Sequence, residues 1–133
     1  MSAALAMVEA SVPLAAENGW AMHIAVMDDG ANLKAYARMD NSMLLAQDIA
    51  MAKANTSARF PGPTGALAGF AFNEQGATPF AFMPGDIVFL TGGLPIFSEG
   101  AQVGGIGVSG AQADEDERCA QAGLDAAAAA GLL

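Results

Sequence analysis

The chain has 133 residues, 53% of them hydrophobic, and its 14 Asp and Glu residues against five Lys and Arg give a net charge of −9. We expect one domain over residues 1–133, and with so few cations no binding surface for nucleic acid or for an anionic membrane. The single cysteine excludes an internal disulfide and a multi-cysteine metal site, and no apolar run has the form of a signal peptide or a membrane span, so the cytoplasm is the expected location.

Few charged residues are available to coat a small monomer. Charged side chains make up only 14% of the sequence, which also contains 16 glycines and eight methionines. This composition predicts that part of the surface is buried between subunits of a homo-oligomer. The alternative is a small monomer with many surface alanines.

The first predicted element is a helix over residues 2–18. Ser2 can cap its start, and Gly19 can end it in the left-handed conformation. Pro13 lies inside this segment and predicts a kink or a restart there.

A β-hairpin follows, with strands over residues 20–27 and 33–39 joined by a turn at residues 28–32. Alternation along the second strand places three polar side chains on one face: Lys34, Tyr36 and Arg38.

The longest predicted helix starts at a cap, Asn41 or Ser42, and continues to Arg59. Two prolines and a glycine at residues 61–63 end it. Its apolar face is predicted from helical spacing to contain Leu45, Ile49 and Ala52.

Residues 65–86 have the least regular pattern, with phenylalanines and Met83 between glycines and prolines. They predict a long ordered loop with one or two helical turns. Three further strands are predicted at residues 87–90, 94–98 and 102–108.

The last predicted helix begins at Asp114, where Glu117 three residues later completes a capping box, and ends at Gly131. Together these elements predict an α/β (α+β) fold with one five-stranded antiparallel sheet packed with helices.

Three glycines fall inside the final predicted strand, at Gly104, Gly105 and Gly107. Glycine inside a strand usually marks a bulge or the close approach of another backbone or a ligand. We expect a neighbouring subunit and a small ligand to cover this bare backbone.

An ordered set of short motifs covers nearly the whole chain. They are IAVMD at 24–28 with Gly30 and Leu33, RMD at 38–40, AKA at 52–54 with Thr56, Phe60 with Pro63 and Thr64, GGLPI at 92–96, VGGIGVSG at 103–110, and DE at 114–115 followed by CAQAG at 119–123. In this order they resemble the GlcG/HbpS family, which also includes the C-terminal domain of PduO-type proteins.

The resemblance implies a profilin-like fold, homo-oligomers and, in some members, haem binding. It also implies iron ligation through a histidine of the first helix, and this chain has none there. The only histidine, His23, or a methionine would have to substitute.

Lys53 and Arg38 lie within these motifs and are candidate catalytic residues together with Asp40. Lys53 stands among alanines, where an amine can be desolvated and its pKa lowered. It can stabilise negative charge or move a proton, while Arg38 can hold a carboxylate. The alternative is that Lys53 forms a structural ion pair with Asp40 or Asp28.

The same motifs and the phenylalanine-rich loop supply the expected ligand-binding residues. These are His23, Asp28, Thr56, Thr64, Phe82, Gly92 and Gly93. We expect no metal site from the acidic residues near 114–117, because neighbours on one helix start do not converge on one point.

The sequence leaves three functions open. The first is binding of a small organic ligand near subunit interfaces, haem or another planar compound being what the resemblance implies. The second is a cofactor-independent lyase, dehydratase or isomerase acting on a small catabolic acid or aromatic compound. The third is a non-catalytic accessory subunit.

Overall fold

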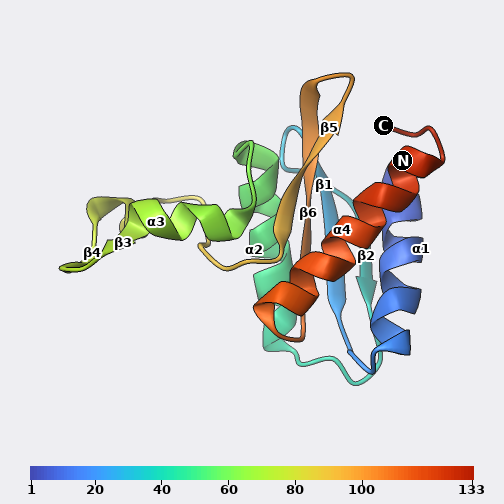
Figure 1. Cartoon of the computed structure of the whole chain (residues 1–133), viewed down its shortest axis with the longest axis horizontal. Coiled ribbons are helices and arrows are strands. Elements are labelled where there is room, and N and C mark those ends of the chain that lie inside the picture. Colours follow the sequence, from blue (N-terminus) through green and yellow to red (C-terminus); the bar gives the residue numbers. More distant parts are fainter.

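A four-stranded antiparallel sheet, with strand order β2-β1-β6-β5, forms the centre of the computed structural model, which describes residues 1–133 (Figure 1). The main elements are α1 (Ser2–Glu17), β1 (His23–Asp28), β2 (Leu33–Arg38), α2 (Leu45–Arg59), β5 (Gly93–Ser98), β6 (Ala101–Ser109) and α4 (Ala113–Ala129). The mixed α/β class with an antiparallel sheet is confirmed. None of the helices is both long and apolar enough to span a bilayer.

The predicted sheet had one strand too many. Residues 87–90 have no strand partner, and the sheet has four strands instead of five. This segment still makes hydrogen bonds, because the hydroxyl of Thr56 accepts from the backbone N–H of Val88 and that of Thr64 donates to the carbonyl of Leu90. Side chains of the preceding helical segments therefore replace the ladder that a neighbouring strand would provide.

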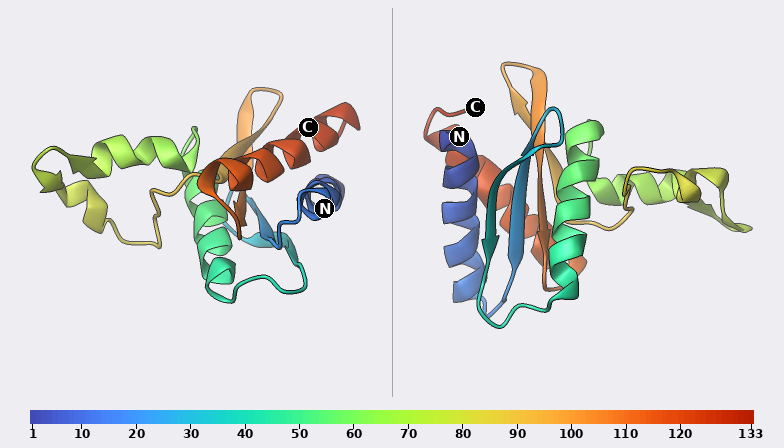
Figure 2. Two further views of the ribbon diagram at one scale, coloured as in Figure 1. Left: turned by 60° about the horizontal axis from the view of Figure 1, so that its bottom comes forward. Right: turned by 180° about the vertical axis from the view of Figure 1, so that it is seen from behind.

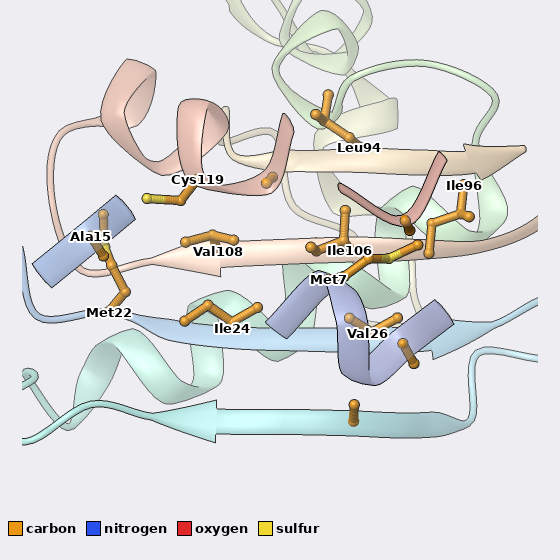
Figure 3. Close-up of a cluster of buried hydrophobic side chains, with 14 residues drawn as sticks. Met7, Ala15, Met22, Ile24, Val26, Leu94, Ile96, Ile106, Val108 and Cys119 are labelled. Atoms are coloured by element: carbon orange, nitrogen blue, oxygen red, sulfur yellow. The ribbon is translucent and has the colours of Figure 1, made fainter. Parts of the chain in front are cut away.

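Helices α1 and α4 cover one face of the sheet, and α2 covers the other (Figure 2). Between the sheet and the helix pair lies the main core, in which Met7 of α1 packs with strand residues such as Ile24 and Ile106 (Figure 3). The alternation of β1 explains the two layers, because Ile24 and Val26 face this core while Ala25 and Met27 face α2.

Two of the three glycines of β6, Gly105 and Gly107, lie directly under α2, whereas Gly104 packs against the backbone of Met27 in β1. A Cβ atom at Gly107 would lie 2.3 Å from the carbonyl oxygen of Ala50 and 2.3 Å from the nitrogen of Ala54, and one at Gly105 would lie 2.3 Å from the nitrogen of Ala58. The prediction that a second subunit and a ligand cover this strip is therefore wrong. A helix of the same chain covers it, at a backbone separation that only glycine permits.

Small side chains form the buried face of α2. Ala46, Ala50 and Ala54 are fully buried, whereas Leu45 on the same helix is 60% exposed. The predicted apolar face of Leu45, Ile49 and Ala52 was wrong, because closeness to the glycine strand selects residues by size and not by hydrophobicity.

The predicted caps of three helices also differ. The capping box of α4 uses Gln112 and Glu115, two residues before the predicted pair, and neither α1 nor α2 has a side-chain cap at its start. Asp114 and Glu117 are left on the first turns of α4, where they face the positive end of the helix dipole. The predicted left-handed conformation of Gly19 after the first helix is confirmed, and Gly131 after the last helix has a left-handed backbone as well.

Residues 64–91 form an arm that projects away from α2 and from the sheet (Figures 1 and 2). Its short elements are η1 (Thr64–Leu67), α3 (Ala68–Ala71), β3 (Phe72–Asn73), β4 (Gly76–Ala77) and η2 (Pro79–Phe82). The expected ordered loop with helical turns is thus confirmed. No residue from 72 to 91 is buried.

The thiol of Cys119 lies inside the contact between α1 and α4. Cys119 has no exposed surface, and its carbonyl oxygen accepts a hydrogen bond of 2.8 Å from the hydroxyl of buried Ser11. Burial, with a smaller contribution from the charge of Asp116, raises the pKa of Cys119 to about 11.

We expect the folded protein to resist alkylation at Cys119. Near neutral pH about one thiol in ten thousand is ionised at such a pKa, and the sulfur has no access to solvent. Iodoacetamide labelling followed by intact-mass measurement should show no modification until denaturant unfolds the chain. Rapid labelling without denaturant would contradict this packing.

Candidate functional site

Lys53 extends from α2 into a buried ion pair with Asp116 of α4. Its Nζ donates to Oδ2 of Asp116 at 2.8 Å and to the carbonyl oxygen of Val108 at 2.9 Å. The two side chains are only 3% and 4% exposed. The other carboxylate oxygen of Asp116 accepts from the backbone N–H of Ala111 at 3.0 Å. The ion pair therefore connects α2, α4 and the end of β6.

Burial opposes the charges of this pair. Desolvation lowers the pKa of Lys53 and raises the pKa of Asp116, and in each residue it outweighs the attraction of the partner. The predicted structural partners of Lys53, Asp28 and Asp40, were wrong, because Lys53 faces β6 and the start of α4 and neither of those acids lies there.

Two threonines and two glycines lie beside the ion pair and form a polar seam with it: Thr56, Thr64, Gly92 and Gly93. Gly93 donates its backbone N–H to the hydroxyl of Thr64 at 3.0 Å, and a Cβ atom at Gly92 would lie 2.6 Å from Nζ of Lys53. The hydroxyl of Thr56 accepts from Val88 at 3.0 Å. The structure therefore brings together Lys53, Thr56, Thr64, Gly92 and Gly93 as the buried junction between α2 and the end of the arm.

His23 lies apart from this seam, at the start of β1. The ring is fully buried, and both nitrogens are used when Nε2–H donates to the carbonyl oxygen of Met43 at 3.0 Å and Nδ1 accepts from the hydroxyl of Tyr36. Partial burial raises the pKa of Tyr36. In this arrangement neither nitrogen is free to bind iron.

The remaining predicted polar residues lie on the outside. Asp28 accepts three hydrogen bonds within its own turn, from Gly30 and from the backbone and side chain of Asn32, and the backbone N–H of Asn32 is the main cause of its lowered pKa. Arg38 and Asp40 are exposed and line a shallow hollow of about 600 Å³ beside Trp20. They form no ion pair with each other.

The three predicted catalytic residues therefore do not meet in one place. Lys53 is enclosed and bound to Asp116, whereas Arg38 and Asp40 face solvent at the end of β2. No cluster of three or more metal-binding side chains occurs in the structure.

Two cavities lie beside α2, and both include Ile87. One is an open hollow of about 640 Å³ beside Asp48, Met51 and Asp86. The other is a slot of about 180 Å³ between the last turns of α2 and the arm, lined by Thr56, Arg59, Phe60, Leu67, Phe80, Met83 and Ile87.

Phe82 lies on the arm, next in the chain to the slot residue Met83, and is 77% exposed. Phe70 and Phe72 are also exposed, and four phenylalanines of the arm lie in a chain of ring contacts with centroids 5.8 to 6.0 Å apart. Aromatic rings at such distances attract each other. They give the arm an apolar surface, on a segment in which no residue from 72 to 91 is buried.

Two residues of this region were missed as candidates for a function of their own: Asn55 and Arg59. Asn55 donates to the carbonyl oxygen of Gly85 at 2.7 Å and accepts from Nε of Arg59 at 3.0 Å. The spacing of Asn55 and Arg59, four residues apart on a helix, was a signal that could have found them. Asp116 was one of the candidate acids at the start of the last predicted helix, but the sequence did not indicate that Lys53 is its partner.

Comparison with known proteins places these observations in a family. A sequence model described as "Haem degrading protein HbpS-like" matches residues 1–125. Protein GlcG of Escherichia coli (strain K12) is 36% identical over 106 residues, which cover 80% of this chain and 77% of GlcG.

Solved structures agree with the fold. The crystal structure of a double mutant of HbpS from Streptomyces reticuli has a TM-score of 0.84 at 34% identity, covering 93% of this chain and 83% of that one. The crystal structure of a complex of PduOC with haem has a TM-score of 0.85, with coverage of 95% and 92%. At 22% identity the second likeness shows the shared fold alone.

Proposed function

This chain belongs to the HbpS-like family of haem-degrading proteins, and we propose that it binds a planar organic ligand of the haem type against its arm, between two subunits of a homo-oligomer. The observation that carries the proposal is the exposed aromatic surface of the arm. Phe70, Phe72 and Phe82 are 63%, 50% and 77% exposed on a segment in which no residue from 72 to 91 is buried.

Such a surface favours a covering partner. Exposed apolar patches of this kind mark interaction sites, and flat aromatic ligands stack on phenylalanine rings. Between residues 64 and 91 the only charged side chains are Glu74 and Asp86, so few charges have to be desolvated when the arm is covered. A second copy of the chain has the same arm with few charges, as an isologous contact requires.

The groups available to haem are limited. The arm presents the thioether of Met83, which is 49% exposed, and His23 has both nitrogens in hydrogen bonds. A methionine can serve as an axial ligand of haem iron. Exposed phenylalanine rings can stack on a porphyrin plane, and Met83 is the residue that we propose beside the iron.

The family description and the haem complex of PduOC support this ligand class. No reaction is proposed, because Lys53, Arg38 and Asp40 are not gathered at one site. The lyase-type enzyme and the accessory subunit stay predictions from the sequence.

We expect hemin to bind with a shift of its Soret band, and Phe82→Ala to weaken binding roughly tenfold through the loss of stacking and buried area. Phe97→Ala is the matched control, since Phe97 is an exposed phenylalanine (43%) on β5 and outside the arm. Met83→Leu should change the spectrum more than the affinity.

Native mass spectrometry of the same variants tests the oligomer. The wild-type protein should be larger than a monomer, and Phe70→Asp with Phe82→Asp should dissociate it. A monomeric wild type, or equal hemin affinity in the Phe82 and Phe97 variants, would count against the proposal.

A further inference from the structure

The slot between α2 and the arm indicates a second binding site, distinct from planar-ligand binding at the arm surface. We propose that it binds a small apolar carboxylate, with the carboxylate on Arg59 and the hydrocarbon body inside the slot. The site lies within one chain and does not depend on an oligomer or on haem.

The walls of the slot select an apolar body. Five of its seven lining residues are hydrophobic: Phe60, Leu67, Phe80, Met83 and Ile87. They come from the end of α2, from η1 and from the returning end of the arm. A cavity of about 180 Å³ between separate segments has room for a small organic molecule and not for haem.

Arg59 is the only charged residue that lines the slot. No carboxylate of the protein lies within ion-pair distance of it, and its only hydrogen bond is from Nε to Oδ1 of Asn55 at 3.0 Å. The two terminal amino groups of the guanidinium are therefore free for an anion, and their planar fork matches a carboxylate.

Asn55 holds this guanidinium in position. Its amide nitrogen donates to the carbonyl oxygen of Gly85 at 2.7 Å while its amide oxygen accepts from Arg59, so one side chain fixes both the arginine and the returning arm. Asn55 is accordingly a positioning residue. Fixing the cation before binding lowers the entropy lost when the anion arrives.

The lining of the slot includes one further polar side chain, that of fully buried Thr56. Its hydroxyl accepts from the backbone N–H of Val88, and the hydroxyl proton has no acceptor among the protein atoms. A buried donor of this kind favours a ligand that carries an oxygen. Thr56 and Arg59 lie three residues apart on α2, which puts both on the same side of the helix.

Benzoate is the probe for this site, and benzylamine is its control, because the two have similar shapes and opposite charges. Saturation-transfer NMR on the full chain should detect benzoate and give at least about tenfold weaker binding of benzylamine. Arg59→Gln should weaken benzoate binding about tenfold or more, and Asn55→Ala by a smaller factor.

Two further variants separate the slot from other causes. Ile87→Phe fills the slot without removing the guanidinium and should abolish benzoate binding. Arg118→Gln removes an arginine elsewhere, on α4, and should leave the binding unchanged. Equal binding of benzoate and benzylamine, no effect of Arg59→Gln, or no benzoate signal at all would each overturn the proposal.

Discussion

Replacing Lys53 with methionine is expected to lower the free energy of unfolding by about 3–5 kcal/mol, the usual loss when one partner of a buried ion pair is removed. Asp116 would remain 4% exposed and without its cation, because methionine fills the space of the lysine stem but donates no hydrogen bond. The carbonyl oxygen of Val108 would lose the same donor. Urea unfolding followed by far-UV circular dichroism measures the difference.

The double variant Lys53→Met with Asp116→Asn is the matched control. Asparagine keeps an oxygen for the backbone N–H of Ala111 and carries no charge, so the double variant should be clearly more stable than Lys53→Met alone. If Lys53→Met cost less than about 1 kcal/mol, or if the second substitution restored nothing, the ion pair would not be a structural connection between the helices.

The pH dependence has a definite sign. Burial holds the pKa of Asp116 above its ordinary value of 3.8, and without Lys53 no cation opposes that effect. A carboxyl whose folded-state pKa is raised stabilises the fold below its unfolded pKa, and this contribution is lost as the pH rises through the folded pKa. The deficit of Lys53→Met relative to wild type should therefore be largest near neutral pH and should shrink as the pH falls toward about 4.

The elements that the sequence predicted well are those fixed by local signals. The hairpin at Asp28–Asn32, the glycine ends of α1 and α4, and the arm as an irregular segment all follow from turn residues and periodicity. Such features depend on a few neighbouring residues and need no knowledge of the rest of the fold.

The sequence could not show which helix packs on which strand, or which residues far apart in the chain lie in contact. Gly105 and Gly107 indicated a close approach, but nothing in their spacing names α2 as the partner. The same gap explains the wrong partners of Lys53, because Asp116 is 63 residues away and comes near only when the middle of α2 and the start of α4 lie beside the same strand. Residues 87–90 have a strand-like composition, yet threonine side chains occupy their hydrogen-bonding groups.

Gly107→Ala is the second large effect that we expect, with a loss of at least about 3 kcal/mol, at the upper end of the range for overpacking. The new methyl group would lie 2.3 Å from the carbonyl oxygen of Ala50 and 2.3 Å from the nitrogen of Ala54. Both are backbone atoms of α2, so no side-chain rotation can relieve the contact. Thermal and urea unfolding of the variant measure the loss.

Gly69→Ala is the control for the glycine substitution itself. Gly69 lies in α3 without a left-handed backbone, and a methyl group added there would have no atom within 4 Å, so the change should be within about 1 kcal/mol of neutral. Adding Ala54→Gly to Gly107→Ala should rescue nothing, because it removes a side chain and leaves the clashing nitrogen in place. Rescue by that substitution would show that side-chain volume, and not backbone proximity, sets the spacing of α2 and β6.

A displacement of α2 would also affect ligand binding, because residues of the seam and of the slot lie on this helix. Lys53, Thr56 and the pair of Asn55 and Arg59 all extend from this helix toward the sheet, the arm and the slot. If α2 moves away from β6, the arm loses its bond to Asn55 and the slot loses one of its walls. Gly107→Ala should therefore weaken benzoate binding even in the fraction of molecules that remains folded, whereas Gly69→Ala should not.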